Sequence, residues 1–484
     1  MYICGMKPLI YLNSEQLQYI GVTLENPYHS IIPQGVTAIA GPNGAGKSTL
    51  TRILERGWNF TRNSISSPIG KLDIKRIDFS DIHTLTGFKA EYYQQRYEAS
   101  MNDDVPTVGE IIGCDTTSLR WKKLSEALGI QNLLSRKANY LSSGELRKVL
   151  VVRMICSEMP DVIILDNPYI GLDAKSRKVF DAALEEVADS GVSLILAICD
   201  PAEIPDYADA VIPVNNLTVG ATVTRDEKGS EKLRNAVAPL FSFAVDSSKI
   251  PSPERHYPHT GDELVNLDKC TVAYGTKTIL QEISWIVKRG EHWALSGPNG
   301  CGKSTLLSLI HADNPKVYSN NVKVFGRRRG TGETIWDVKK RIGYISPEMH
   351  LYFGGGSATV RENIARGLND TVGFYTRLHP EQVEKADKWI KLLHLEDIAD
   401  RRFCTLSSGE QRMTLLARTF IKNPELMILD EPMHGLDACR KKAVKSIINS
   451  LASRDNTTMI FVTHTPEELP ECITHSLTLR GNET

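Results

Sequence analysis

A glycine-rich loop between two apolar runs occurs twice in the chain. The first copy, GPNGAGKST, covers residues 41–49, and the second, GPNGCGKST, covers residues 297–305. Both copies have the spacing G-x-x-x-x-G-K-S in a strand–loop–helix context, which is the pattern of a phosphate-binding loop. The glycines let successive backbone N–H groups converge on one anion, and the helix N-terminus adds positive potential there. The alternative, a glycine turn with a chance lysine, is disfavoured by a full match in this context.

Each loop predicts a set of phosphate and metal ligands. Lys47 and Lys303 would reach the β- and γ-phosphates of a nucleotide, and the hydroxyls of Ser48 and Ser304 would ligate Mg²⁺. The residues that would surround the phosphates are Gly41, Pro42, Asn43, Gly44, Ala45, Gly46, Lys47, Ser48 and Thr49 in the first copy and Gly297, Pro298, Asn299, Gly300, Cys301, Gly302, Lys303, Ser304 and Thr305 in the second. We interpret Cys301 as a passive filler, because a small residue suits that position.

The repeat also predicts the domain organisation. A chain of 484 residues is too long for one ordinary domain, and the two loops indicate two halves of roughly 220 residues each. We expect the first domain at residues 1–224, a linker at 225–262 and the second domain at 263–484. The linker contains four prolines and mixed charge, which is typical of a loosely ordered connector. A helix-like stretch within it, residues 231–240, could pack on either half.

Composition excludes several classes of protein. The formal net charge of −1 gives no whole-chain basic footprint of a nucleic-acid binder, although a local patch stays open. No apolar run approaches the 18 residues of a membrane span, and the N-terminus lacks a signal-peptide layout. The nine cysteines form no C-x-x-C pair, which indicates reduced thiols and a cytoplasmic location.

Further motifs recur in the same order in both halves. Each half has the pentapeptide LSSGE before an apolar helix, an apolar strand that ends in Asp166 or Asp430, the turn G-L-D, and a last apolar strand that ends at Cys199 or His464. An aspartate at the carboxyl end of a buried parallel strand lies at the ligand-binding edge of the sheet, where it is the expected Mg²⁺ partner. The pentapeptide alone is as well explained by a plain helix cap as by an anion contact.

This ordered set of motifs resembles the ATP-binding cassette (ABC) superfamily, and both halves carry it. The resemblance implies an α/β fold with two tandem nucleotide-binding domains, each with a mostly parallel sheet, a helical lobe that carries the signature and an antiparallel β segment. It also implies that Tyr274 stacks on adenine, with Tyr19 as a guess for the first half. The signature residues it implies are Ser142, Ser143, Gly144, Ser407, Ser408 and Gly409. The stretch FGRRRGTGETIWD (residues 325–337) is similar to the ModF-type tandem ATPases, a group named for molybdate transport.

In this family two cassettes close head-to-tail around two ATP molecules with Mg²⁺, so the resemblance implies intramolecular closure of the two halves. The second half carries every catalytic part, namely Lys303, Glu431 to polarise the attacking water, and His464 to contact the γ-phosphate. The first half has Asn167 and Cys199 at the last two positions. A neutral amide has no usable base near pH 7, and loss of a general base typically costs about 10²–10⁴ in rate. We therefore expect one hydrolysing and one holding site; the alternative is that both hydrolyse, with water oriented by another group.

Two further stretches are ambiguous. The glutamine that usually contacts Mg²⁺ and water is not identified in either half, since register places Pro347 there, next to Glu348, while Gln94 and Gln95 fit an ordinary helix surface. Three consecutive arginines, residues 327–329, are better explained by a solvated turn than by an RNA or acidic-partner contact.

Three functions fit these motifs. The first is the energising ATPase subunit of an ABC importer, of molybdate type by resemblance, attached to a membrane permease at the inner face of the membrane. The second is a soluble ATPase that acts on ribosomes, nucleic acid or another complex, against which the proline-rich, weakly basic linker argues. The third is a non-hydrolysing ATP sensor, which an intact Glu431 and His464 disfavour.

Overall fold

The computed structural model describes most of the chain in two compact units. The first unit holds the described residues of Met1–Lys89 and Ser100–Phe243 together with Leu436–Cys439, and the second holds those of Ala244–Gly435 and Arg440–Thr484. The structure describes every residue except 1–5, 58–64, 79–105, 114–120, 122–124, 127–128, 138–140, 142–144, 146–147, 154–159, 170–171, 173, 227–228, 242–244, 253–260, 275–276, 299–300, 312, 348, 350–356, 370–376, 455–456, 464–465 and 481–484.

The first unit is built on a sheet with the strand order β2-β3-β11-β10-β5-β9-β8-β7, to which β12 adds beside β10. The five strands from β10 to β7 all run parallel. A smaller antiparallel sheet has the order β4-β1-β6. The strands are β1 Pro8–Leu12, β2 Gln16–Tyr19, β3 Val22–Glu25, β4 Ile31–Pro33, β5 Val36–Ala40, β6 Ile65–Ser66, β7 Ile74–Asp78, β8 Val162–Asp166, β9 Ser193–Ile198, β10 Ala210–Asn215, β11 Thr218–Val219 and β12 Val223–Thr224.

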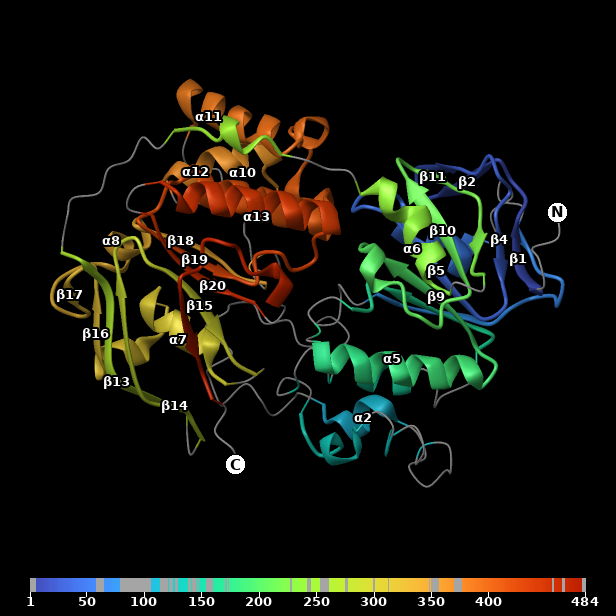
Figure 1. Cartoon of the computed structure of the whole chain (residues 1–484), viewed down its shortest axis with the longest axis horizontal. Helices are drawn as coiled ribbons and strands as arrows, with labels where there is room; N and C mark the ends of the chain where they lie inside the picture. Colours follow the sequence, from blue (N-terminus) through green and yellow to red (C-terminus); the bar gives the residue numbers. More distant parts are fainter. Residues whose placement is uncertain are drawn as a thin grey trace. The chain divides into compact units, whose positions relative to one another are not determined.

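Helices cover both faces of this sheet because its central strands are apolar on both sides. Every residue of β5 and β8 is buried, as expected for parallel strands between two helical layers. One apolar core joins Val36 and Leu165 to α5, and the other joins Ile39 and Ile164 to α1. In Figure 1, α5 runs alongside β9 in this unit. The helices are α1 Lys47–Arg56, α2 Val108–Ile112, α5 Ala174–Asp189 and α6 Glu231–Val237.

Helix α6 lies within the stretch expected to be a linker, and it belongs to the first unit. Leu233 and Val237 of this helix are fully buried in the same core as α5. Arg234 fastens the helix further, because its guanidinium donates to the carbonyl of Ile204 and pairs with Asp206 at 2.7 Å. These contacts fix residues 231–237 on the first unit.

The second unit contains a parallel sheet and an antiparallel one. The parallel sheet has the order β18-β19-β20-β15-β21, and the antiparallel sheet has the order β14-β13-β16-β17. Its strands are β13 Glu263–Tyr274, β14 Lys277–Lys288, β15 His292–Ser296, β16 Asn321–Val324, β17 Arg327–Arg328, β18 Ile342–Ile345, β19 Leu426–Asp430, β20 Thr458–Val462 and β21 His475–Thr478. The α/β fold class with a mostly parallel sheet and an antiparallel segment is thus confirmed.

Helix α7 lies between the two sheets of the second unit. Its leucines Leu306, Leu307 and Leu309 share one apolar core with β13, β14 and the parallel sheet, and Figure 1 shows the helix in this position. The remaining helices, α10 to α13, lie on the other side of the parallel sheet (Figure 1). The helices are α7 Lys303–Ile310, α8 Ile335–Lys339, α10 Val360–Arg366, α11 Pro380–Leu392, α12 Ser408–Ile421 and α13 Ala438–Ala452.

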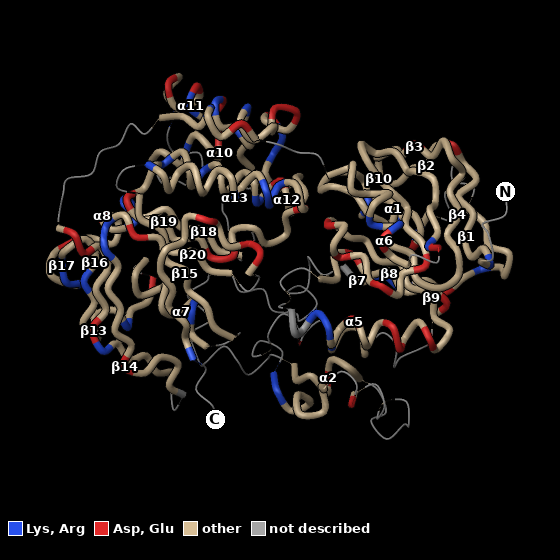
Figure 2. The backbone as a smooth tube through the Cα atoms, in the orientation of Figure 1, with Lys and Arg blue, Asp and Glu red and all other residues tan. Residues whose placement is uncertain are grey.

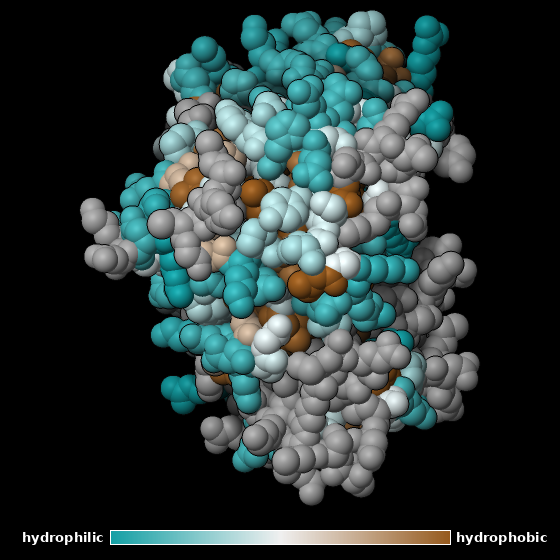
Figure 3. Space-filling view, turned by 90° about the vertical axis from the view of Figure 1, so that its right-hand side faces the viewer, coloured by the Kyte–Doolittle hydropathy of each residue, from teal (hydrophilic) through white to brown (hydrophobic). Residues whose placement is uncertain are grey.

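The surface is polar and mixed in charge. Figure 2 shows acidic and basic positions interspersed along the tube of α11, whose sequence contains glutamate, aspartate and lysine. In the face shown in Figure 3, apolar side chains form separate spots among hydrophilic ones. Within the described part of the chain, no helix is both long and apolar enough to span a membrane.

The three arginines at residues 327–329 do not form the predicted solvated turn. Arg327 and Arg328 are exposed but form strand β17, which pairs with β16. Arg329 is only 5% exposed and its guanidinium lies 2.6 Å from the carboxylate of Glu333. A buried arginine needs such a partner, so this prediction was wrong for Arg329.

Candidate functional site

The glycine-rich loop of the second unit connects β15 to α7. Gly297 has φ +143°, and a Cβ there would lie 2.5 Å from the carbonyl oxygen of Leu479. Gly302 has φ +98°, and its Cβ would lie 2.7 Å from a methyl group of Leu280. Gly302 is the N-cap residue of α7 and has no side chain that could cap the helix, so the first-turn N–H groups are available to an anion.

The loop of the first unit likewise joins a strand to a helix, β5 to α1. A Cβ on Gly41 would lie 1.9 Å from the carbonyl oxygen of Val214, and Gly46 has φ +108°. Gly46 also caps its helix without a side-chain hydrogen bond. A side chain at these four positions would clash with neighbouring atoms of the protein, so both loops require glycine there. The residues present fit the triphosphate of ATP.

The two loop lysines take equivalent positions. Lys47 Nζ donates to the carbonyl oxygens of Gly41 at 2.8 Å and Pro42 at 2.9 Å. Lys303 Nζ donates to those of Gly297 at 2.8 Å and Pro298 at 3.0 Å. Each ammonium group is thus held at its own loop, where its charge favours a bound phosphate.

The turns after β8 and β19 share an unusual backbone. Asn167, directly after Asp166, has φ +53°, and Glu431, directly after Asp430, has φ +45°. The N–H of Asn167 donates to Ala197 O on β9, and that of Glu431 donates to Val462 O on β20, both at 2.9 Å. Left-handed backbone at a residue other than glycine costs free energy and concentrates at functional sites. Asn167 and Glu431 are therefore equivalent positions that differ in side-chain chemistry.

A buried arginine on α12 holds the second of these turns. Arg412 is 3% exposed, and its guanidinium donates to the backbone carbonyls of Asp430 at 3.1 Å, Pro432 at 3.0 Å, Glu431 and Ser346. Burial lowers the pKa of Arg412 to about 10, against the opposing charges of Glu431 and Asp430. No sequence motif assigns Arg412 a role, because α12 carries two buried arginines, Arg412 and Arg418, and the sequence does not distinguish the one that holds this turn.

The signature residues divide between described and undescribed parts of the chain. Ser407 caps α12, with its hydroxyl oxygen accepting from the N–H of Glu410 and the Glu410 carboxylate accepting in return. This is the capping-box arrangement, so Ser407 caps α12. Ser408 and Gly409 follow in the first turn of the helix. The predicted residues that lie outside the described part of the chain are Ser142, Ser143, Gly144, Asn299, Gly300 and His464.

The two candidate adenine-stacking tyrosines occupy matching places in their hairpins. Tyr274 ends β13 and pairs with Lys277, and Tyr19 ends β2 and pairs with Val22. The hydroxyl of Tyr274 accepts a hydrogen bond from Asn314 Nδ2 at 2.9 Å. Tyr19 was only a guess from the sequence, and its hairpin position makes it the structural counterpart of Tyr274.

The structure describes some of the positions to which the sequence gave no clear role. Pro347 is the second residue after β18, while Glu348, Gln94 and Gln95 lie outside the described residues. Cys199, which follows β9, is half-buried, and Cys301 is buried within its loop. A Cβ on Gly297 would lie 2.7 Å from Cys301 Sγ, which agrees with a requirement for a small residue there.

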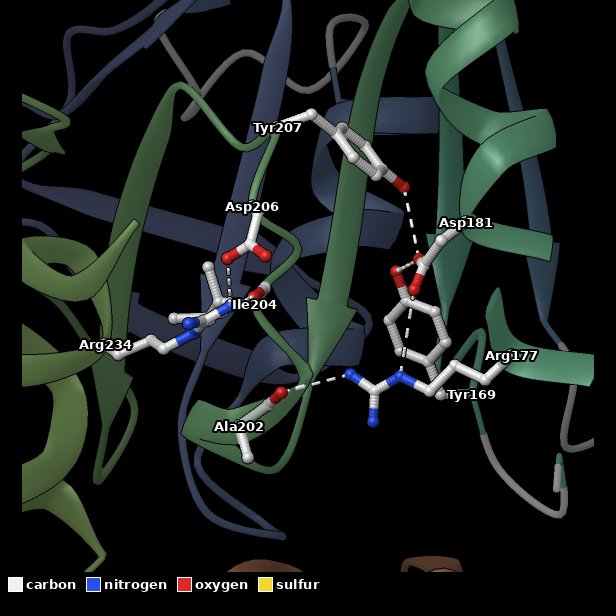
Figure 4. A network of polar contacts seen from close by, with 8 residues as sticks. All are labelled: Tyr169, Arg177, Asp181, Ala202, Ile204, Asp206, Tyr207 and Arg234. Carbon is white, nitrogen blue, oxygen red and sulfur yellow. Dashed lines mark hydrogen bonds and ion pairs between the residues drawn. The ribbon is translucent and has the colours of Figure 1, made fainter. Parts of the chain in front are cut away.

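A cluster of polar contacts fixes the segment after Asn167 to α5 (Figure 4). The hydroxyls of Tyr169 and Tyr207 donate to the Asp181 carboxylate at 2.6 and 3.3 Å. The Arg177 guanidinium lies over the Tyr169 ring, 4.5 Å from its centroid, and donates to Ala202 O. Burial raises the pKa of Asp181, although both hydroxyls and Arg177 oppose that shift. The sequence analysis did not identify this cluster.

A second cluster lies at the carboxyl end of α7. His311 donates to the Asp313 carboxylate at 2.7 Å, and Lys339 pairs with its other oxygen. The His311 ring stacks on Tyr344 of β18, with centroids 4.4 Å apart. Burial would raise the pKa of Asp313, but its two cationic partners outweigh burial and lower it to about 2. The phosphate-loop helix is thus tied to β18 and α8.

The chain matches a family model and several known proteins. The model described as ABC transporter matches residues 24–170 and 280–434. The chain is 36% identical over 462 residues to the ABC transporter ATP-binding protein ModF of Escherichia coli (strain K12), with 94% of this chain and 93% of the relative covered. It is 27% identical over 452 residues to an uncharacterized ABC transporter ATP-binding protein of Schizosaccharomyces pombe, with 90% of each covered.

Solved structures share the fold at low sequence identity. A structure described as a model of ribosome-bound archaeal Pelota and ABCE1 superimposes with a TM-score of 0.61 at 19% identity, covering 97% of this chain and 78% of that one. A structure described as RNase-L Inhibitor gives a TM-score of 0.54 at 20% identity, covering 97% and 91%. With the repeated loops, the matching turns and the family match together, the chain belongs to the ABC transporter family as a ModF-like tandem ATPase.

Proposed function

We propose that the second cassette hydrolyses ATP and that the first mainly holds it. The observation that carries this proposal is the equivalence of Asn167 and Glu431, which share one left-handed turn and one hydrogen-bond pattern. A carboxylate at that position accepts a proton from an attacking water, whereas a carboxamide does not. The side-chain difference therefore separates the two sites by chemistry and not by fold.

The residues of the second cassette have distinct roles in this proposal. The loop N–H groups and Lys303 bind the β- and γ-phosphates, and Glu431 orients and deprotonates the attacking water. Arg412 is a positioning residue, because it holds the carbonyl of Glu431. Ser304 and Asp430 would hold Mg²⁺, which supplies charge neutralisation at the phosphates when bound. His464 would contact the γ-phosphate.

Closure of the two cassettes around the nucleotides is part of the proposal. Ser142, Ser143 and Gly144 of the first signature would complete the site of the second cassette, and Ser407, Ser408 and Gly409 would complete that of the first. Tyr274 would stack on adenine in the second site, and Tyr19 in the first. These roles rest on the resemblance to the family, in which nucleotide binds between two cassettes.

A single-turnover experiment tests the division of labour. The full chain is incubated with radiolabelled ATP at two molecules per chain and trapped, and hydrolysed nucleotide is counted per chain. We expect one ADP and one intact ATP per chain, and two intact ATP in Glu431→Gln. Asn167→Gln is the matched control and should leave the wild-type ratio. Two ADP per wild-type chain, or unchanged hydrolysis in Glu431→Gln, would contradict the proposal.

The relatives support a proposal for the cellular role. We infer that the ATPase energises an ABC importer with a membrane permease, because the chain is similar to ModF over almost its whole length. On this inference the protein acts at the cytoplasmic face of the membrane, and the molybdate-type substrate comes from the resemblance alone. The likeness to the ABCE1 structures, at 19–20% identity, concerns the fold.

The alternative is a non-transport ATPase that acts on ribosomes or another complex. A pull-down of Glu431→Gln with ATP, from both membrane and ribosome fractions, distinguishes the two. Enrichment of one polytopic membrane protein, absent with Lys303→Ala, supports the importer. ATP-dependent co-sedimentation with ribosomes, without such a membrane protein, supports the alternative.

A further inference from the structure

The carboxylate of Asp166 in the first unit already has a cationic partner. Arg76 of β7 places Nη2 2.7 Å from Asp166 Oδ2, and the side chains are 9% and 1% exposed. Arg76 Nε donates to Thr51 Oγ1 at 3.1 Å, and Asn167 Nδ2 lies 3.3 Å from Asp166 Oδ1. Both carboxylate oxygens therefore accept from protein donors inside the unit.

The sheet register explains how Arg76 reaches this carboxylate. Strands β7 and β8 are parallel neighbours, with Arg76 beside Ile164 and Asp78 beside Asp166. Arg76 is two residues before Asp78, so it projects from the same face of the sheet as Asp166. Helix α1, which carries Thr51, covers that face. The guanidinium thus lies between the sheet and the phosphate-loop helix.

The second unit has no basic residue at the matching positions. Tyr344 occupies the place of Arg76, because Ile342 and Ile74 both pair with the first residue of the neighbouring strand. Leu307 occupies the place of Thr51, four residues after the loop lysine in each case, and it is fully buried. The aromatic ring of Tyr344 stacks on His311 and carries no positive charge toward Asp430.

We propose that Arg76 takes the place of the divalent metal as partner of Asp166, so that the first site binds a nucleoside triphosphate without Mg²⁺. An ion pair with short, charge-assisted hydrogen bonds neutralises the carboxylate that would otherwise attract the metal. A divalent cation that approached Asp166 would also be repelled by the guanidinium. The residues of the first site therefore do not fit Mg²⁺ as the motif suggested, and Ser48 alone does not make a metal site.

The inference rests on the proposed function, since it takes ATP binding at the first site as given. It adds that the holding site and the hydrolysing site differ in metal content. Nucleotide at the first site would persist when divalent ions are removed, because Lys47, the loop N–H groups and the α1 N-terminus remain. Nucleotide at the second site would be released under the same conditions.

The number of Mn²⁺ ions bound per chain is a direct count of the metal sites. Wild-type protein is incubated with Mn²⁺ and AMPPNP, a non-hydrolysable ATP analogue, and bound Mn²⁺ is measured by electron paramagnetic resonance. We expect two AMPPNP and one tightly bound Mn²⁺ per chain, and one AMPPNP after EDTA. Lys47→Ala should remove the EDTA-resistant nucleotide, and Lys303→Ala should remove the Mn²⁺.

A charge-neutral variant tests the role of Arg76 itself. Arg76→Gln should raise bound Mn²⁺ toward two per chain and tighten Mn²⁺ binding at the first site by roughly tenfold. Lys75→Gln, one residue away on the same strand, is the control and should keep one Mn²⁺. If Arg76→Gln does not fold, the wild-type count decides. Two nucleotides with two Mn²⁺ in wild type would overturn this inference alone, whereas one nucleotide per chain would overturn the holding site as well.

Discussion

Arg412 donates from the first half of α12 to the main-chain carbonyl of Glu431, the residue at the left-handed turn after β19. This bond joins the helix that carries the signature to the residue proposed as general base. The same guanidinium holds the carbonyls of Asp430 and Pro432. A displacement of α12 would therefore be transmitted to the position of the catalytic carboxylate through one side chain.

We predict that Arg412→Met destabilises the second unit by about 3 kcal/mol, because it leaves several buried carbonyls without a donor. ATP turnover should fall further than global stability accounts for. Hydrogen exchange across residues 426–434 measures the local effect, and phosphate release measures turnover. Arg402→Met is the matched control, since Arg402 is exposed. Unchanged exchange in this segment with Arg412→Met would show that the bonds do not hold the turn.

The two loop lysines should differ in consequence although their contacts are equivalent. Lys303→Ala should abolish steady-state phosphate release, with a loss of about 10²-fold or more. Lys47→Ala should weaken the binding of nucleotide at the first site. It should slow ATP turnover only indirectly, by weakening the closure of the two cassettes. Filter binding of ATP and phosphate release, measured on the same preparations, separate these effects. Equal loss of turnover in both variants would indicate two hydrolysing sites.

We predict that Asp313 stabilises the second unit to an extent that depends on pH. Its pKa in the folded protein is about 2, below its ordinary value of 3.8. A lowered folded pKa means that the stabilisation is present above pH 3.8 and is lost as the pH falls through 2. Asp313→Asn should therefore destabilise the second unit at pH 7 by up to about 2 kcal/mol.

Urea unfolding of wild type and Asp313→Asn at several pH values checks this. The difference between their free energies of unfolding should shrink below pH 3.8. Asp397→Asn, at an exposed position of the same unit, should show no such dependence. A constant difference down to pH 2 would mean that the ion pairs of Asp313 with His311 and Lys339 contribute nothing.

We predict that the contribution of Asp181 to the stability of the first unit depends on pH in the opposite direction. Burial raises its pKa above 3.8, so the stabilisation is complete below pH 3.8 and is lost as the pH rises through the folded value. Asp181→Asn keeps a neutral acceptor for the Tyr169 hydroxyl and should remove this loss. Unfolding of the first unit, followed by hydrogen exchange of α5 between pH 4 and 7, gives the slopes. Parallel slopes in wild type and Asp181→Asn would contradict the assignment.

The sequence predicted the parts of the fold that depend on local pattern. The two apolar strands predicted to end in Asp166 and Asp430 are β8 and β19, which end at those residues. Strand β9 is a continuous apolar run that ends at Ile198, one residue before Cys199. The glycine loops were recognisable because their residue spacing follows from one requirement, the convergence of backbone N–H groups on a phosphate, and α1 and α7 begin at the loop lysines.

Contacts that depend on register between distant strands were not predictable. Arg76 reads as an ordinary polar residue of a half-exposed strand until β7 is placed beside β8. Arg412 and Arg329 read as surface residues until their carbonyl and carboxylate partners are known. The Tyr169–Asp181 contact joins a turn to helix α5. Residue spacing does not specify which side of that helix faces the turn. In each case the partner is set by tertiary packing, which the sequence pattern does not contain.

The strand order has a consequence for biosynthesis. In the second unit β20 lies between β15 and β19, so the strand that separates the phosphate loop from Asp430 is synthesised after the other strands of that sheet except β21. The matching strand of the first unit, β9, ends at Ile198, and β11 at Val219. During translation the first cassette can complete its nucleotide edge before β13, the first described strand of the second unit, is made. The second cassette gains that ability only after β20 has been synthesised.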